Sequence, residues 1–507
     1  MRSKKRAYVE TYGCQMNIAD GELMEGVLEG EGYEIVGAPE HADVVLVNTC
    51  AIREHAERRV LGRVAQLNAL KRERPDMILG VTGCMAQRMG DDLLRKAPWV
   101  DLVMGPDGYR GLPTQLRRIE DGTGDGEAGA SRSTRAVARP EGRDGDGGRA
   151  SAGPPPAEVF PGQSRAAATG RTVIERDGVG DGRIQLAVVD LDTGENYEGL
   201  EQRRTSGVSA WIPVQRGCDH RCTFCIVPYV RGPEKNRRPG DVLDEVAALA
   251  GRGITEVTLL GQTVNSYRSG EWGFPRLLRE VGRVPGIRRV RFTSPHPNDV
   301  TEELVDVMAT EPAVCEQLHL PVQSGSDRVL KRMVRRYTVE SFLEKVALVR
   351  QAVPDVALST DVIVGFPSET DAEFRDTLDL MRTVRFDDAF TYKYSRREGT
   401  PATRMPEGWF LPDDVAQARL EELIDVARSV QAEINASEVG RVERVLVEKE
   451  GRDPGEVLGR TRRNKVVVFP GDPSWIGSYR TVRLTRTTGA TFGGELVRAP
   501  AALAGSA

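Results

Sequence analysis

Residues 214–232 read VQRGCDHRCTFCIVPYVRG, and this stretch decides the fold around it. It places Cys218, Cys222 and Cys225 (the loop triad) in one C-x3-C-x2-C loop, directly after a segment that predicts a strand. A 4Fe-4S cube needs one external ligand for each of its four irons, so three cysteines leave one iron open to a substrate. A zinc site with His220 as fourth ligand and chance clustering are the alternatives, but the second C-x2-C half typical of zinc sites is missing.

Apolar runs alternate with amphipathic stretches from residue 207 to 437. Helices are predicted by amphipathic stretches such as DVLDEVAALAGRG, and strands by the six runs AWIPVQ, ITEVTLLG, IRRVRFTS, VCEQLHLPV, DVALSTDVIVG and FDDAFTYKY. Six βα repeats are too few for an eightfold barrel, so we expect a partial (β/α)6 barrel of the α/β class. Cys315, inside the fourth run, is expected in the core.

Residues 6–118 show the same alternation on a smaller scale, which predicts a small open α/β domain with parallel strands. Cys14, Cys50 and Cys84 (the rim triad) each fall where a predicted strand ends, in YGCQMN, VNTCAIREHA and VTGCMAQR. The carboxyl ends of parallel strands meet at one edge, where ligands bind in such sheets, so three thiolates could share one rim. Their wide spacing carries no metal signature, and three buried structural cysteines are the alternative.

Residues 119–206 separate these two regions and predict a disordered Gly/Pro-rich linker. The stretch from 121 to 170 contains eleven Gly and five Pro and almost no apolar side chain larger than Ala. Such a composition cannot bury enough surface to offset its ordering entropy. For residues 171–205, a short hairpin docked on a neighbouring element is the alternative.

Residues 438–500 follow a long amphipathic helix and read as short strands with Gly and Pro punctuation, which predicts a small β-barrel. From 441 to 500 there are 12 Lys and Arg against 7 Asp and Glu, a local excess of +5. Four basic residues beside the run VVVF (the basic quartet) predict a loop that contacts RNA phosphates: Arg460, Arg462, Arg463 and Lys465. A solvated hairpin tip is the alternative.

The whole chain has 507 residues, 70 Lys and Arg against 75 Asp and Glu, and seven cysteines. This length excludes a single small binding module, and the net charge of −5 argues against a general polyanion-binding protein. Apolar runs long enough for a membrane helix and the apolar core of a secretory signal are both missing, so we expect a cytoplasmic protein without disulfides. No P-loop, HExxH or GxSxG motif competes with the cysteine chemistry.

The loop triad, placed after the first strand of a six-repeat barrel, resembles the signature of the radical S-adenosylmethionine enzymes. The resemblance implies a 4Fe-4S cluster whose open iron binds S-adenosylmethionine and cleaves it to a 5′-deoxyadenosyl radical. DVIVGFPSE departs from the family's adenine motif at Asp361 and Glu369, and no glutamate follows Gly261, where the family has a Gly-Gly-Glu turn. Turn or packing roles are the alternative for each residue expected to contact S-adenosylmethionine: Phe224, Gly261, Gln262, Gln323, Ser324 and Asp361.

The three segments around the rim triad resemble the amino-terminal domain of the methylthiotransferases, radical enzymes that insert sulfur into a C–H bond and methylate it. This resemblance covers residues 6–118 and 207–500. It implies that the rim triad holds a second 4Fe-4S cluster, whose open iron carries the sulfur to be transferred. It also implies that residues 438–500 are a TRAM domain, a small RNA-binding β-barrel.

The segments CQMN at Cys14 and LLGQTVNSY in the barrel are typical of the methylthiotransferase branch that acts on N6-isopentenyladenosine beside the tRNA anticodon. The threonylcarbamoyladenosine branch more often has Cys-Lys-Val-Asn, and the branch that modifies a ribosomal protein has Cys-Pro-Lys-Asn. The resemblance implies that one S-adenosylmethionine methylates the sulfur and a second yields the radical that removes hydrogen from adenine C2. Such an aromatic C–H bond is neither acidic nor electrophilic enough for general-base or nucleophilic chemistry.

The partners implied are the tRNA anticodon stem-loop, an electron donor such as flavodoxin or ferredoxin, and a sulfur donor, with no membrane. Two alternatives remain at this point. One is methylthiolation of N6-threonylcarbamoyladenosine in tRNA. The other is a non-enzymatic iron–sulfur protein that binds RNA and senses redox state.

Overall fold

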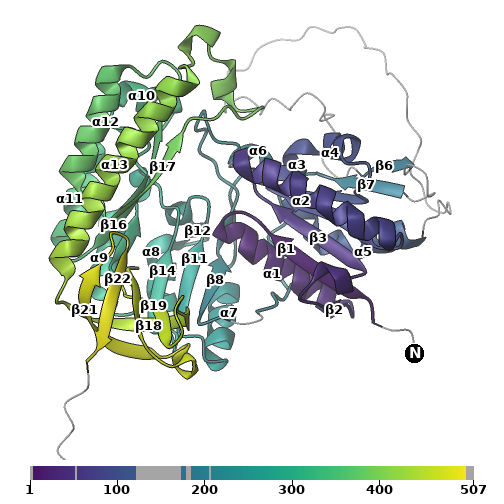
Figure 1. The fold of residues 1–507 in the computed structure, drawn as a ribbon, viewed down its shortest axis with the longest axis horizontal. Helices are drawn as coiled ribbons and strands as arrows, with labels where there is room; N and C mark the ends of the chain where they lie inside the picture. Colours follow the sequence, from purple (N-terminus) through teal and green to yellow (C-terminus); the bar gives the residue numbers. More distant parts are fainter. Residues whose placement is uncertain (1–3, 52–53, 122–172, 178–183, 205–206, 498–507) are drawn as a thin grey trace, which may run out of the picture.

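The computed structural model describes residues 4–51, 54–121, 173–177, 184–204 and 207–497, with only the backbone for residues 54–58 and 173–177. Three bodies follow one another along the chain (Figure 1): an N-terminal α/β domain, a parallel β/α barrel and a small β-barrel at the C-terminal end. The expected α/β architecture is therefore confirmed. No helix in the described part of the chain is long and apolar enough to cross a membrane.

The described part of the N-terminal domain forms a seven-stranded sheet in the order β2-β1-β3-β4-β5-β7-β6. Neighbouring strands pair in parallel, except that β6 runs antiparallel to β7. β3 and β4 are buried on both faces, as apolar runs such as VVLV require. The strands are β1 (Arg6–Thr11), β2 (Glu34–Ile35), β3 (Val44–Thr49), β4 (Ile78–Gly83), β5 (Leu102–Met104), β6 (Val173–Asp177) and β7 (Ile184–Val188).

Helices cover both faces of this sheet. On one face α1 and α5 pack Leu28 and Leu116 against Val44, and on the other α2 packs Val64 against Val45. Adjacent strand residues enter different cores because successive side chains point to opposite faces. The helices are α1 (Gln15–Gly30), α2 (Glu54–Glu73), α3 (Cys84–Met89), α4 (Asp91–Lys96) and α5 (Leu112–Asp121).

Part of the predicted linker over 119–206 is regular structure. α5 continues to Asp121, and β6 and β7 form a hairpin that extends the N-terminal sheet. β7 is buried along its whole length because its apolar run IQLAV pairs with β5. A continuously disordered linker is therefore wrong, and the hairpin alternative describes β6 and β7; residues 122–172 lie outside the described residues.

The central domain is a partial (β/α)6 barrel, as predicted. β8, β11 and β14 form one parallel sheet and β15, β16 and β17 another. A parallel bridge between Val290 and Val314 joins the two sheets, so the six strands follow one another in chain order. The strands are β8 (Ser209–Pro213), β11 (Glu256–Leu260), β14 (Arg289–Phe292), β15 (Gln317–His319), β16 (Ala357–Val364) and β17 (Asp388–Lys393).

Helices on the outside of the barrel supply its apolar shell, which packs on side chains such as Val257 and Val290. Thr370 and Glu373 form a capping box that fixes the start of α12. The helices are α7 (Pro239–Gly251), α8 (Phe274–Gly282), α9 (Glu302–Thr310), α10 (Asp327–Met333), α11 (Val339–Ala352), α12 (Asp371–Val384) and α13 (Asp413–Glu438). Cys315 is buried, as expected.

Residues 442–496 close into a five-stranded barrel in the order β18-β19-β20-β22-β21, which confirms the predicted small β-barrel. Its interior holds apolar side chains such as Val445, Phe469 and Phe492. In Figure 1 it lies beside the central barrel, at the end of α13. The strands are β18 (Val442–Glu450), β19 (Glu456–Arg460), β20 (Val466–Pro470), β21 (Tyr479–Thr487) and β22 (Thr491–Leu496).

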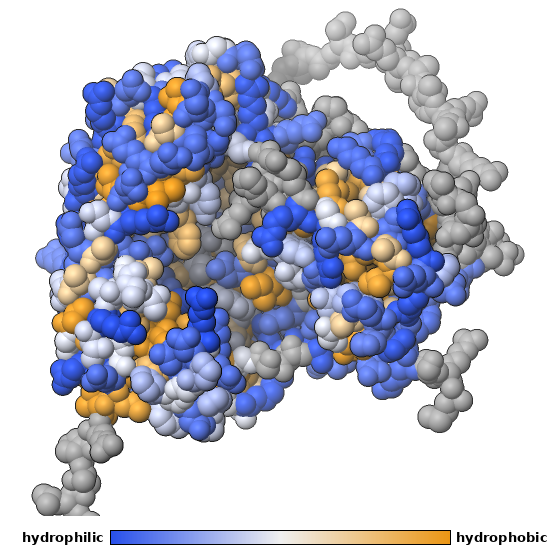
Figure 2. Space-filling model, viewed as in Figure 1, coloured by the Kyte–Doolittle hydropathy of each residue, from blue (hydrophilic) through white to orange (hydrophobic). Residues whose placement is uncertain are grey.

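The N-terminal domain packs on the first strands of the central barrel. Met16 and Ala19 of α1 contact Leu260 and Trp211 from β11 and β8. Figure 2 shows that the face in view is hollowed between these two domains. The ends of β1, β3 and β4 and the loop after β8 are brought together at this seam.

Candidate functional site

The loop triad follows β8 and the short strand β9 (Gln215–Arg216). Its cysteines are buried or half-buried, and the Cys225 N–H donates to the Cys222 carbonyl over 3.0 Å. Gly217 makes the tight entry to the loop possible, because it has a φ of +77° and an added Cβ would lie 1.9 Å from the Pro233 carbonyl oxygen. The sequence therefore folds these cysteines into one compact loop.

Polar groups from two other loops of the central barrel reach the sulfur atoms of the loop triad. Arg335 donates from Nη1 to Cys222 Sγ over 3.4 Å, and the Thr263 hydroxyl lies 3.2 Å from Cys218 Sγ. Burial, together with the neighbouring Cys222, raises the pKa of Cys225 to about 12. Thiols held neutral by burial become thiolates when a metal displaces their protons, so the donor set fits a metal cluster.

The rim triad is also brought together. Cys14, Cys50 and Cys84 follow the parallel neighbours β1, β3 and β4, so they share one edge of the sheet. An added Cβ on Gly13 would lie 2.6 Å from Cys50 Cβ, which shows how closely these strand ends approach. The hydrogen bond with Cys50 lowers the pKa of Cys14 to about 6, whereas burial raises the pKa of Cys84.

The two triads face each other across the seam between the domains. α6 (Val227–Arg231) begins two residues after the loop triad and packs Ile226 and Val230 against Ala51 and Cys84. Arg231 at its end donates from Nε to Cys84 Sγ over 3.1 Å. A side chain from one cysteine loop thus touches a cysteine of the other set.

The residues predicted to contact S-adenosylmethionine differ in whether their side chains already have partners within the protein. Gln262 Oε1 is buried without a hydrogen-bond partner among the described residues. Phe224 packs in a cluster with Phe366 and Met333, and Asp361 lies 3.3 Å from His319 Nε2. Gln262 therefore keeps an atom for a ligand, and the contacts of the other residues remain predictions.

The three remaining candidates make packing contacts or hydrogen bonds within the barrel. Gly261 lies where a Cβ would approach Gln215 Oε1 to 2.9 Å. The backbone of Gln323 bridges to β16, and the Ser324 hydroxyl accepts from the Ser326 N–H over 3.2 Å. These roles fit the packing alternative, and the contacts with S-adenosylmethionine stay predictions.

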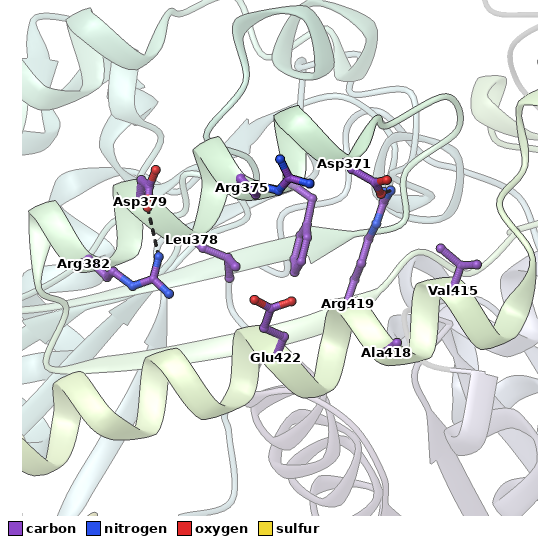
Figure 3. Close-up of a pocket in the computed structure, with 10 residues that line it drawn as sticks. Asp371, Arg375, Leu378, Asp379, Arg382, Val415, Ala418, Arg419 and Glu422 are labelled. Carbon is purple, nitrogen blue, oxygen red and sulfur yellow. Dashed lines mark hydrogen bonds and ion pairs between the residues drawn. The ribbon is translucent and has the colours of Figure 1, made fainter.

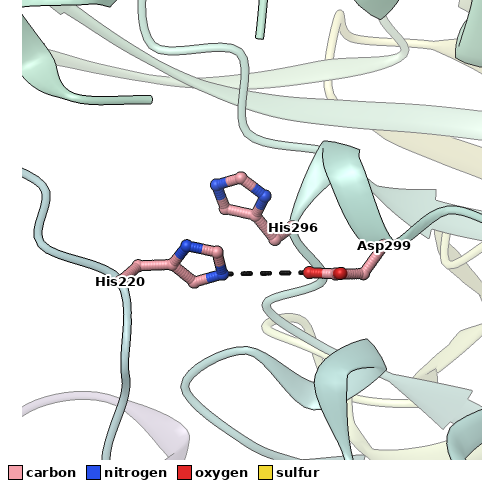
Figure 4. A group of neighbouring side chains, drawn as sticks. All are labelled: His220, His296 and Asp299. Atoms are coloured by element: carbon pink, nitrogen blue, oxygen red, sulfur yellow. Dashed lines mark ion pairs between the residues drawn. The ribbon is translucent and has the colours of Figure 1, made fainter. Parts of the chain in front are cut away.

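Beside the loop triad lies a group of three side chains that the sequence did not predict to be in contact. His220 stacks on His296 with ring centroids 4.0 Å apart, and its Nε2 lies 3.8 Å from Asp299 Oδ2 (Figure 4). His296 Nδ1 accepts from the Asn298 N–H, so its buried, unpartnered Nε2 carries the proton, and burial lowers its pKa to about 2. The neutral His296 ring is therefore a hydrogen-bond donor through Nε2 here. His220, which the zinc alternative adds to the cysteines, lies with His296 and Asp299, and the ligand atoms of these three residues are within 4.8 Å of one another.

The basic quartet lies at the end of β19 and in the turn that leads to β20, against the central barrel. Arg463 donates to Glu438 over 2.8 and 2.9 Å and to Glu443 over 2.8 Å. Lys465 Nζ lies 2.7 Å from Asp387. Both basic side chains are only 8% exposed, which leaves no room for an RNA phosphate.

The same loop is held by the central barrel through its backbone. Arg291 of β14 donates to the carbonyls of Thr461 and Arg462, each over 2.7 Å, and Arg462 pairs with Glu316 at 2.8 Å. The predicted phosphate contacts are therefore wrong for Arg463 and Lys465, because carboxylates of other elements already neutralise these buried side chains. Arg462 keeps 27% of its side chain exposed, so its RNA contact stays a prediction. Arg460 is 37% exposed, and its RNA contact stays a prediction.

A pocket of about 550 Å³ lies between α12 and α13 on the outside of the barrel (Figure 3). Basic and acidic side chains alternate along it, among them Arg375, Arg419, Asp371 and Glu422. None of the candidate site residues lines it, so it is a charged surface groove separate from the cysteines.

Family models match all three bodies of the chain. The description "Uncharacterized protein family UPF0004" matches residues 6–105, the radical SAM superfamily matches residues 212–381, and the TRAM domain matches residues 436–497. Among solved structures, the radical S-adenosylmethionine methyltransferase TsrM from Kitasatospora setae is similar with a TM-score of 0.52 and 15% identity, over 90% of this chain and 80% of that one. The cobalamin-dependent radical enzyme OxsB is similar with a TM-score of 0.50 and 11% identity, over 83% of this chain and 56% of that one. These likenesses show the fold alone.

Several curated relatives that cover nearly the whole chain carry the name tRNA-2-methylthio-N(6)-dimethylallyladenosine synthase. The relative from Chloroherpeton thalassium is 39% identical over 97% of this chain and 96% of its own. The relative from Moorella thermoacetica is 39% identical over 98% of this chain and 99% of its own, and that from Acidothermus cellulolyticus is 41% identical over 95% and 86%. The chain belongs to the family of the tRNA-2-methylthio-N(6)-dimethylallyladenosine synthases.

Proposed function

We propose that this protein is a radical S-adenosylmethionine methylthiotransferase that converts N6-isopentenyladenosine beside the tRNA anticodon to its 2-methylthio derivative. The main support for this proposal is the pair of cysteine triads, which lie on either side of one domain seam, where Arg231 contacts Cys84. Sulfur insertion needs a site that makes a radical and a site that holds sulfur, and both must be close to the same adenine. Two adjacent three-cysteine sites meet that requirement.

The two triads each suit a 4Fe-4S cluster with one open iron. When bound, the cluster on the loop triad supplies the electron that cleaves S-adenosylmethionine, and the cluster on the rim triad supplies the sulfur. Around the loop triad, Arg335 and Thr263 place hydrogen bonds on cysteine sulfur atoms, and Gln262 offers a buried oxygen to the cofactor. His296 offers a buried N–H beside the same loop. Four of the six cysteines are buried and the other two are half-buried, which would limit the access of water to a reactive radical.

The partners follow from this reaction. The tRNA anticodon stem-loop is the substrate, and the C-terminal β-barrel, which matches the TRAM domain, contributes to its binding. Because Arg463 and Lys465 are buried in ion pairs, RNA contacts fall to Arg460, Arg462 and other basic side chains of this barrel. Its exposed ones include Lys449, Arg452, Arg483 and Arg486. An electron donor such as flavodoxin or ferredoxin and a sulfur donor complete the reaction in the cytoplasm.

The test is a reaction of anaerobically reconstituted enzyme with S-adenosylmethionine, dithionite and tRNA that carries N6-isopentenyladenosine. Mass spectrometry of the digested tRNA should show the 2-methylthio nucleoside in place of its precursor. The matched control is tRNA without the isopentenyl group but with N6-threonylcarbamoyladenosine. Methylthiolation of that control tRNA alone would support the threonylcarbamoyladenosine alternative, and an unmodified tRNA in both reactions would favour the non-enzymatic sensor.

A further inference from the structure

Arg231 is buried at the seam between the N-terminal domain and the central barrel, with 3% of its surface exposed. It ends α6, the helix that follows the loop triad, yet its Nε donates to Cys84 Sγ of the rim triad over 3.1 Å. Its Nη2 donates to Asp20 Oδ2 over 2.7 Å. One guanidinium therefore bonds a carboxylate and a cysteine sulfur of the opposite domain.

The charges around Arg231 do not cancel. Asp20 also pairs with Arg216 at 3.1 Å, so one carboxylate faces two guanidiniums. The neighbouring Lys235 and Asp107 form a separate neutral pair at 2.8 Å. Among the Asp, Glu, Lys and Arg side chains one positive charge therefore remains, so its counter-charge has to come from the cysteines of the rim triad.

A cluster on the rim triad would supply the missing negative charge. An oxidised 4Fe-4S core carries two positive charges and three thiolates carry three negative ones, so the assembly is singly negative, and reduction adds a second negative charge. The Nη1 group of Arg231 is also buried without a hydrogen-bond partner among the described residues. A free N–H donor and a positive charge that no carboxylate balances thus lie at the sulfur of Cys84, where an anionic group fits.

We propose that Arg231 is a positioning residue for the rim-triad cluster, which it holds in an easily reduced form by its positive charge and its N–H bonds to sulfur. Both effects stabilise the more negative, reduced cluster and raise its potential. The inference rests on the proposed second cluster. If Arg231 only pinned the two domains together, its removal would loosen the seam and leave the potential of the cluster unchanged.

The test uses the full chain with the loop triad changed to alanine, so that any iron belongs to the rim triad. In this background Arg231→Gln removes the charge and leaves Asp20 paired with Arg216, which limits the damage to folding. Arg231→Lys keeps the charge but loses the forked donor. The matched control is Arg238→Gln, because the Arg238 side chain is 72% exposed and pairs only with Glu198 among the described residues.

The iron content of each anaerobically reconstituted protein is assayed first. The cluster is then titrated potentiometrically, and electron paramagnetic resonance reports the reduced fraction. At a fixed potential, Arg231→Gln should lower the ratio of reduced to oxidised cluster about tenfold, equivalent to 59 mV for one electron. Arg231→Lys should lower it less, and Arg238→Gln should leave it unchanged.

An unchanged midpoint potential in an iron-loaded Arg231→Gln protein overturns the proposal and leaves the second cluster standing. If that variant alone fails to hold iron, the Arg231→Lys protein decides, because an unchanged midpoint there also overturns the proposal. Absence of iron from the background protein itself overturns the second cluster and this inference together.

Discussion

The Arg463→Ala variant should loosen the C-terminal β-barrel from the central barrel rather than weaken RNA binding. Arg463 makes hydrogen bonds to Glu438 over 2.8 and 2.9 Å, and Glu438 has 4% of its side chain exposed. Removing one partner of a buried ion pair costs about 3–5 kcal/mol, since the other charge is left unpaired. Lys465 remains 3.9 Å from Glu438, so we expect the lower end, about 3 kcal/mol.

Hydrogen exchange measures this loss directly on the full-length protein. A loss of about 3 kcal/mol should speed amide exchange in β19 and β20 about 100-fold if these strands exchange when the docked loop opens. The matched control Arg452→Ala removes an exposed arginine of the same barrel and should change stability by less than about 0.5 kcal/mol. Unchanged exchange in Arg463→Ala, with a flatter salt dependence of tRNA binding, would refute this account and restore the phosphate contact.

The other predictions concern the clusters, the linker and the RNA surface. Reconstituted protein should hold about eight irons, and alanine at the loop triad should leave about four with no cleavage of S-adenosylmethionine; stoichiometric zinc would contradict this. Alanine at the rim triad should spare that cleavage and abolish sulfur insertion, so loss of both in a folded protein would show that the roles are misassigned. Deletion of residues 124–168 should preserve turnover of tRNA, and a large loss with intact clusters would reveal an RNA contact there. Changing Arg483 and Arg486 to alanine should weaken tRNA binding and flatten its salt dependence, whereas unchanged affinity would place the RNA surface elsewhere.

Much of the fold could be predicted from local sequence patterns. Alternating apolar and amphipathic stretches predicted the six barrel strands, and short runs such as VVVF predicted the terminal β-barrel. The prediction failed at β7, where IQLAV follows a long Gly- and Pro-rich stretch. The stability of that strand comes from its pairing with β5, more than 80 residues earlier, and composition near the strand carries no sign of such a partner.

The candidate site likewise combines residues that are close in sequence with residues that only the fold brings together. The loop triad is readable because its cysteines lie within eight residues, whereas the rim triad needed the strand pattern to bring three distant cysteines to one edge. The RNA-phosphate contact was predicted wrongly for Arg463 and Lys465 because their partners, Glu438 and Asp387, belong to other elements of the fold. Arg231 was visible as a charge at the end of the apolar run IVPYV, but only the docked N-terminal domain reveals its contact with Cys84.

The most direct test of the proposed function is a mass-spectrometric profile of tRNA nucleosides from a strain that lacks this gene. We expect loss of 2-methylthio-N6-isopentenyladenosine and accumulation of N6-isopentenyladenosine. Expression of the wild-type chain should restore the profile, and expression of the rim-triad alanine variant should not. A deletion strain that keeps 2-methylthio-N6-isopentenyladenosine, or loses only the methylthio form of N6-threonylcarbamoyladenosine, would contradict the proposed function.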